Sequence, residues 1–174
     1  MENFTKKAIQ SKLLDVLKTT PADKITVTSV VDACDMNRNT FYYHFKDFDS
    51  LLRSTLTDLF TSTLNACAEE DEKTCGLAMA MGRLTERVAE LTNIFNTEKS
   101  PIMTICLEDM AEDAVNAWRD RRSPNGSSSR EGREIAGMAR IMFSGLMLDW
   151  LLKPADKKYD LRALVDHAWD RLIW

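Results

Sequence analysis

The sequence lacks the groups of residues from which most enzyme and metal sites are built. It has two histidines in 174 residues, and it contains neither a nucleophile motif nor a glycine-rich phosphate-binding loop. Its four cysteines, Cys34, Cys67, Cys75 and Cys106, have neither paired nor metal-like spacing. We therefore expect reduced, mostly buried thiols in an intracellular protein, with no metal and no cofactor. These features argue against an enzyme.

Long apolar runs are also missing. The most apolar stretch, residues 141–152, contains Ser144 and Asp149 and is shorter than the roughly 20 residues that span a bilayer. Charged residues interrupt the N-terminal apolar positions, so we expect no secretory signal. The sequence therefore favours a cytoplasmic protein without a membrane partner.

One acidic cluster could still carry chemistry. Glu108, Asp109, Glu112 and Asp113 form two i,i+4 pairs on one predicted helix. A hydrolytic metal site would need histidine or a second acidic motif that converges on them, and the chain has only two histidines. We interpret the cluster as a solvated face of that helix.

Helical periodicity runs through nearly the whole chain, and no alternation typical of strands is evident, which predicts an all-α fold. Thr26 and Asn37 are predicted N-caps of two short helices. The sequence "RRSPNGSSSREGR" predicts a flexible loop at residues 121–133. The predicted helices span residues 5–19, 26–34, 37–45, a stretch opening at Asp47 or Asp49, 74–96, 100–121, 131–152, and a last helix that ends at Trp174.

The net charge of −4 is distributed unevenly. Residues 1–55 hold eight Lys and Arg against seven Asp and Glu, whereas the rest of the chain holds 15 against 20. The neutral-to-basic end can bind nucleic acid although the body is acidic. Two short helices joined by a tight turn, with a third packed behind them, predict a helix-turn-helix in this end.

The second short helix combines aromatic and cationic side chains. Phe41 and Phe45 share one face with core spacing. The residues left for a partner are Arg38, Asn39, Tyr42, Tyr43 and Lys46. Arg and Asn suit base edges in the major groove, whereas Tyr, Thr, His and Lys suit phosphates. A DNA duplex needs both kinds of side chain, and a protein-binding surface is the alternative that these residues leave open.

Residues 26–52 resemble the DNA-binding domain of the TetR family of transcriptional regulators. The positions that match the family motif are Thr40, Tyr42, His44, Phe45 and Leu51, and the likeness covers about residues 5–60. The stretch "NRNTFYYHF" is similar to the subgroup that includes dihydroxyacetone-kinase regulators. The resemblance implies a DNA-binding domain at residues 1–55 and a helical domain for effector binding and dimerisation at residues 56–174.

The resemblance also implies roles for individual residues. The first helix of the pair would touch phosphate through Thr26 and Thr28, and Arg38, Asn39 and Tyr43 would face bases. The backbone contacts would come from Tyr42, His44 and Lys46. The full expected DNA-binding set is Thr26, Thr28, Asn37, Arg38, Asn39, Thr40, Tyr42, Tyr43, His44 and Lys46. From the residues alone, a partly buried core ring remains the alternative for Tyr42, and a packed ring that caps its helix remains the alternative for His44.

Two positions depart from the family pattern. Asp35 stands where the family has a glycine in the turn, and Asp tolerates the left-handed conformation better than most residues. Phe48 stands where the family has a lysine that approaches a phosphate. Its loss removes one charged contact, for which Lys46 can compensate, and predicts DNA binding that depends less on salt.

The C-terminal part is expected to form a homodimer because residues 141–152 are apolar on nearly every side and the last helix is similarly wide. The candidate interface residues are Phe143, Leu146, Trp150, Leu164, Ala168 and Leu172. A stripe of Met103, Leu107, Met110 and Trp118 is a candidate effector pocket, with plain core as the simpler interpretation.

The function implied is a repressor that binds a palindromic operator in double-stranded DNA and is released by an unknown small-molecule effector. The alternative is a dimeric helical interaction module that has lost specific DNA binding.

Overall fold

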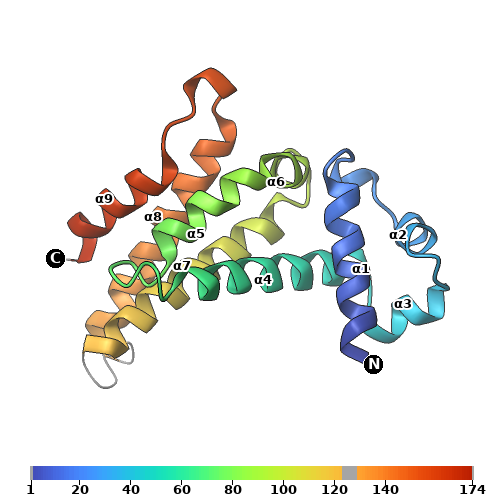
Figure 1. Cartoon of the computed structure of the whole chain (residues 1–174), viewed down its shortest axis with the longest axis horizontal. Coiled ribbons are helices and arrows are strands. Elements are labelled where there is room, and N and C mark those ends of the chain that lie inside the picture. The colour runs from blue at the N-terminus through green and yellow to red at the C-terminus, as the bar shows by residue number, and fades with distance from the viewer. Residues whose placement is uncertain (1, 123–128, 174) are drawn as a thin grey trace. The chain divides into compact units, whose positions relative to one another are not determined.

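The computed structural model describes residues 2–122 and 129–173, and within these ranges every regular element is a helix. The predicted all-α class is confirmed. The helices form two compact units (Figure 1). The N-terminal unit contains residues 1–58 and 88–103, and the C-terminal unit contains residues 59–87 and 104–174. The predicted functional boundary at residue 55 stays a prediction, and residues 88–103 pack with the N-terminal unit.

The N-terminal unit is built on a helix-turn-helix. It contains α1 (Glu2–Leu17), η1 (Ala22–Lys24), α2 (Val27–Ala33), α3 (Arg38–His44), the start of α4 (Phe48–Cys67), α6 (Val88–Phe95) and the start of α7 (Ser100–Arg122). Apolar side chains from these helices are buried together, among them Ile9, Leu13, Val30, Phe41, Leu52 and Leu91.

Polar contacts attach the later segment to this unit. The Asn93 side chain donates to the Leu17 carbonyl oxygen at 2.8 Å, which satisfies an unpaired group at the C-terminus of α1. Lys99 Nζ lies 2.9 Å from an Asp49 oxygen, and this ion pair raises the pKa of Lys99. These contacts explain why a segment distant in sequence packs with the helix-turn-helix.

The expectation of one helix over residues 74–96 is wrong. This stretch divides into α5 (Leu77–Leu84), η2 (Thr85–Arg87) and α6. The α5 helix begins after Gly76, whose φ is +86°, and at its other end Thr85 Oγ1 donates to the Gly82 carbonyl oxygen at 2.6 Å. The break at η2 coincides with the change from the C-terminal to the N-terminal unit.

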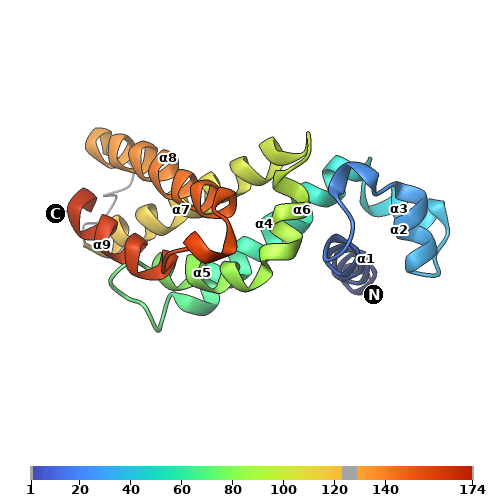
Figure 2. The same cartoon turned by 90° about the horizontal axis from the view of Figure 1, so that it is seen from above.

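In the C-terminal unit, α9 (Leu161–Ile173) contacts both α5 and α8 (Arg130–Leu152) (Figure 2). The Trp169 ring is fully buried, stacks on Phe143 with centroids 5.7 Å apart, and meets the Trp118 ring edge-on at 6.1 Å. A short helix, η3 (Ala155–Lys157), lies in the turn between α8 and α9. By length and composition alone α8 could cross a membrane. One face of it is nevertheless buried within this unit.

The predicted loop at 121–133 is too long at both ends. The α7 helix continues to Arg122, and α8 begins at Arg130 with Ser129 as its N-cap. The middle of the predicted loop, residues 123–128, lies outside the residues that the structure describes. All four cysteines are free thiols, as expected, and all but the half-buried Cys34 are buried.

Candidate nucleic-acid interface

The α2 helix begins with a reciprocal cap. The Ser29 amide donates to Thr26 Oγ1 at 3.1 Å, and the Thr26 amide donates to Ser29 Oγ at 3.0 Å. This capping box satisfies two backbone donors and fixes where α2 starts. Thr26 was predicted both to cap the helix and to touch phosphate. The structure confirms the cap, and the phosphate contact stays a prediction.

The turn between α2 and α3 has the left-handed residue that the sequence predicted. Asp35 has a φ of +53°. Around it, the Met36 amide donates to the Val31 carbonyl oxygen at 3.0 Å, which closes the turn. Burial raises the pKa of the neighbouring Cys34 thiol, against an opposing effect of Lys12, so this thiol stays protonated at neutral pH.

Asn37 caps α3, as expected. Its side-chain oxygen accepts from the Thr40 amide at 2.9 Å and from Thr40 Oγ1 at 3.1 Å. The two residues therefore hold the start of α3, and a role for either of them in binding DNA would be additional to this bond. Behind them, Phe41 is fully buried and Phe45 is 4% exposed, so the predicted core face of α3 is confirmed.

The opposite face of α3 is exposed. Tyr43 is 71% exposed and Tyr42 is 56% exposed, so the buried-core alternative for Tyr42 is wrong. Each ring meets one neighbouring ring: Tyr42 meets Phe41 edge-on at 5.4 Å, and Tyr43 meets the half-buried His44 edge-on at 5.1 Å. Asn39 and Lys46 are also exposed.

A direct bond joins the two helices on the exposed surface. Arg38 Nη2 donates to Thr28 Oγ1 at 2.7 Å, and both residues are exposed. Arg38 thus lies at the start of α3 with its guanidinium held against α2. Sequence reasoning missed this bond because the residues are ten apart and no local pattern links them.

Phe48, at the position of the family lysine, is the first residue of α4 and is half-buried. The start of α4 is held by Asp47 and Ser50, whose backbone amides each donate to the other's side chain at 3.1 Å and 2.8 Å. A half-buried aromatic ring thus stands at the position for which the resemblance implied a lysine.

The predicted effector-pocket residues Met103, Leu107, Met110 and Trp118 are all buried, with exposed fractions of 0, 1, 2 and 9%. Trp118 also lines an open cavity together with Ala68, Glu69, Glu72, Arg121 and Arg122. There the Arg122 guanidinium lies 4.4 Å from the Trp118 ring centroid. This burial favours the plain-core interpretation, and an effector pocket at these residues stays a prediction.

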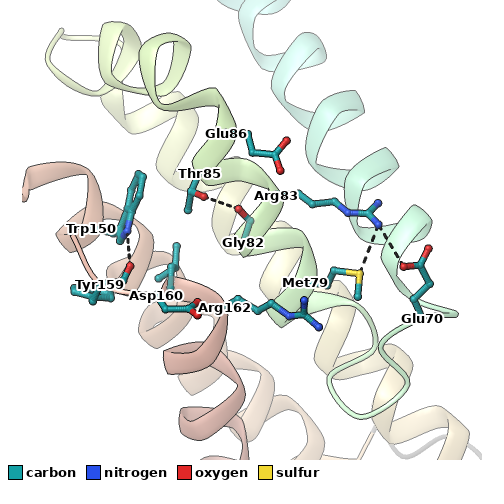
Figure 3. Close-up of a pocket in the computed structure, with 11 residues that line it drawn as sticks. Glu70, Met79, Gly82, Arg83, Thr85, Glu86, Trp150, Tyr159, Asp160 and Arg162 are labelled. Atoms are coloured by element: carbon teal, nitrogen blue, oxygen red, sulfur yellow. Dashed lines mark hydrogen bonds and ion pairs between the residues drawn. The ribbon is translucent and has the colours of Figure 1, made fainter. Parts of the chain in front are cut away.

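A cavity of about 510 Å³ lies instead between α5 and the segment from Trp150 to Arg162 (Figure 3). The Trp150 indole N–H donates to the Tyr159 carbonyl oxygen at 3.0 Å on one side. On the other, Arg83 pairs with Glu70 at 3.4 Å. The walls are largely polar and carry both signs of charge, unlike the mostly apolar lining typical of small-molecule sites.

The predicted dimer residues separate into two groups. Phe143 and Trp150 are buried in their own chain, at 0% and 6% exposure, so they have little surface left for a partner. Leu146, Leu164 and Ala168 are half-buried, and the side chain of Leu172 lies outside the described residues.

The apolar face of α8 that faces away from the core is a different set at heptad-like spacing, which we call the α8 stripe: the exposed Met138, Ile141, Gly145 and Leu152 and the half-buried Leu148. Ile141 and Leu152 are 66% and 67% exposed, and Met138 is 51% exposed. Because the sequence is apolar all round here, periodicity could not separate this face from the core face.

No family model matches the chain, and no curated protein matches its sequence. Among solved structures, the chain is similar to the dihydroxyacetone kinase operon activator DhaS, with a TM-score of 0.67. The likeness covers 97% of this chain and 94% of that chain, at 19% sequence identity. At this identity it shows a shared fold. Membership of the TetR family, and of the subgroup named from the sequence, stays a prediction.

Proposed function

We propose that the protein is a sequence-specific DNA-binding regulator of transcription, of the TetR type. The observation that carries this proposal is the exposed face of α3. There Arg38, Asn39, Tyr42 and Tyr43 project from a helix whose other face is fixed in the core by Phe41. The similarity of fold to an operon activator supports the same proposal.

In this proposal the residues divide into base contacts and backbone contacts. Arg38 and Asn39 lie at the start of α3, the end of a recognition helix that reaches base edges. Lys46 follows the α3 C-cap and is exposed, which suits a phosphate contact. Tyr42 and Tyr43 present hydroxyls on the exposed face, and a tyrosine side chain has only two χ angles to order on binding.

We further propose that the protein binds a palindromic operator as a homodimer. A twofold dimer places two recognition helices about one DNA turn apart, roughly 34–36 Å. The proposed interface is the α8 stripe together with the half-buried Leu146, Leu164 and Ala168, because these residues retain exposed apolar surface within one chain. Phe143 and Trp150 support this face from the core.

Regulation would act as a population shift. An effector bound in the C-terminal unit would favour a dimer whose recognition helices no longer fit successive major grooves. The family resemblance favours a repressor, whereas the structural neighbour is an activator. Both modes need the same operator contacts. A reporter gene placed behind the selected operator distinguishes them, since deleting the regulator raises expression in one mode and lowers it in the other.

The decisive experiment is selection of bound duplexes from a random library by the purified protein, followed by titration of selected and random duplexes at fixed salt. We expect a preferred palindromic site. Arg38→Ala should lose about 1–3 kcal/mol on that site and relax one base position in each half. Lys157→Ala, which removes one exposed positive charge from η3, is the matched control. It should leave the base preference unchanged and alter the affinity only by the small effect of one distant charge. Equal affinity of the wild type for selected and random duplexes would contradict the proposal and support the interaction module instead.

A further inference from the structure

Thr28 is held firmly in place on α2. It is the second residue of the helix, it follows the Thr26–Ser29 capping box, and the same helix buries Val30 and Val31. Its branched Cβ restricts χ1 to few rotamers. Its Oγ1 is an acceptor on the exposed surface and lies 2.7 Å from Arg38 Nη2.

Arg38, by contrast, has a long side chain at an exposed position. A free arginine samples many rotamers, and that freedom is lost when the guanidinium makes a bidentate contact with a guanine edge. A hydrogen bond that already holds one Nη before DNA arrives reduces this loss, because part of the ordering has occurred in the free protein. The planar guanidinium has five N–H donors, so one bond to Thr28 leaves donors for a base.

We infer that Thr28 is a positioning residue that orients Arg38 for base recognition. This inference rests on the proposed DNA binding. It differs from the role that the family resemblance implies for Thr28, which is a phosphate contact. The Thr28 hydroxyl accepts from Arg38 and keeps its own proton. A phosphate contact through that proton would affect all duplexes alike, whereas positioning affects only the base pair that Arg38 reads.

The test uses Thr28→Val, which keeps the shape and removes the hydroxyl, and Thr28→Ser, which keeps the hydroxyl. Each is made in the wild-type and the Arg38→Ala background. Affinity is measured on the selected duplex, on the duplex changed at the base pair read by Arg38, and on a random duplex. Thermal melting checks that each variant is folded.

We expect Thr28→Val to reduce discrimination at that one base pair by about 2- to 12-fold, the range expected for immobilising one long side chain. Affinity for random duplex and the salt dependence should not change. Thr28→Ser should retain most of the discrimination. In the Arg38→Ala background, Thr28→Val should have no further effect, because the group that it positions is gone. Equally weakened binding to every duplex, which persists in the Arg38→Ala background, would overturn the inference and support a direct phosphate contact. The absence of any effect of Thr28→Val would also overturn the inference.

A second measurement needs no DNA. In the free protein, ¹⁵N relaxation of the Arg38 Nε–H should report a restricted side chain in the wild type and Thr28→Ser, and a mobile one in Thr28→Val. Equal mobility in all three overturns the inference even where DNA binding holds. If the side chain is restricted but the wild type does not discriminate between duplexes, then the proposed function fails while the positioning contact stands.

Discussion

Ile141 provides the sharpest test of the proposed dimer. It belongs to the α8 stripe and is 66% exposed in the single chain. Full burial of an isoleucine side chain is worth about 1.5–3 kcal/mol, so covering the two thirds that remain exposed contributes about 1–2 kcal/mol per chain. A twofold dimer contains this contact twice. Ile141→Ala should therefore weaken association by about 2–4 kcal/mol, a rise in the dimer Kd of about 30- to 900-fold.

The same substitution should hardly affect the folded monomer, because exposed positions usually change stability by less than about 0.5 kcal/mol. Phe143→Ala should behave in the opposite way: it removes a buried ring that stacks on Trp169 and should cost about 3–5 kcal/mol of folding stability. Ile105→Ala on α7 is the matched control for the isoleucine change, since Ile105 is 41% exposed but lies outside the stripe.

Sedimentation equilibrium over a range of concentrations measures the dimer Kd, and urea unfolding measures stability. A wild type that stays monomeric at micromolar concentration, or an Ile141→Ala variant with an unchanged Kd, would refute the argument that the α8 stripe is the interface. Operator binding by Ile141→Ala should weaken in parallel with its dimerisation, although the substitution leaves residues 26–52 untouched.

Gly76→Ala should lose at least about 2 kcal/mol of stability in urea unfolding, because φ is +86° and a Cβ would lie 2.8 Å from two backbone atoms, the Ala68 nitrogen and the Leu64 oxygen. Gly137→Ala, whose Cβ would meet no atom within 4 Å, should instead gain about 0.5–1 kcal/mol. A more stable Gly76→Ala than Gly137→Ala would contradict this explanation. Lys46→Ala should weaken binding to all duplexes about equally and lower the slope of log affinity against log salt by about one charge per chain. Phe48→Lys should tighten binding at low salt. No response to either change would mean that this end of the helix-turn-helix does not face DNA. Burial, and after it the hydrogen bond to Asp149, raise the pKa of Tyr159 to about 12, above its ordinary value of 10.0. The folding stability that this shift contributes is therefore present below pH 10 and is lost as the pH rises towards 12. Tyr159→Phe should remove this part of the alkaline loss of stability in melting experiments at different pH values, and an unchanged profile would show that another group causes it.

Local hydrogen bonds made the helix-turn-helix predictable. Thr26 and Asn37 each accept from the amide three residues later, and this spacing is visible in the sequence. The left-handed conformation of Asp35 was expected because the family resemblance implies a glycine at this turn position and because Asp tolerates that conformation better than most residues. The burial of Phe41 and Phe45 followed from helical period alone.

The C-terminal unit was less predictable because its details depend on contacts between distant residues. The break after Leu84 reflects where the chain changes from one compact unit to the other, which local propensity does not encode. The burial of Phe143 and Trp150 in their own chain was not predicted, because a segment that is apolar on every side gives no sign of which face its own core takes; the interface itself stays a prediction. The cavity between α5 and residues 150–162 requires the packing of α9 on α5, which is equally absent from the pattern.

The small number of cations in the helix-turn-helix affects how the proposed dimer would bind DNA. Between residues 26 and 46 the only cations are Arg38 and Lys46, and Asp32 and Asp35 balance them. A single recognition module therefore gains little from phosphate neutralisation, which supplies most of the affinity in strongly basic DNA-binding proteins. Its binding must come mainly from base contacts, which are few on one short helix. In the proposed dimer, two modules would add their contacts and double the base pairs read, and the second module would bind at a high effective concentration. Under the proposed function, a recognition helix-turn-helix with so few cations would therefore depend more strongly on dimerisation than a basic one would. We therefore expect the Ile141→Ala defect in operator binding to persist at low salt, where a charge-driven binder would recover.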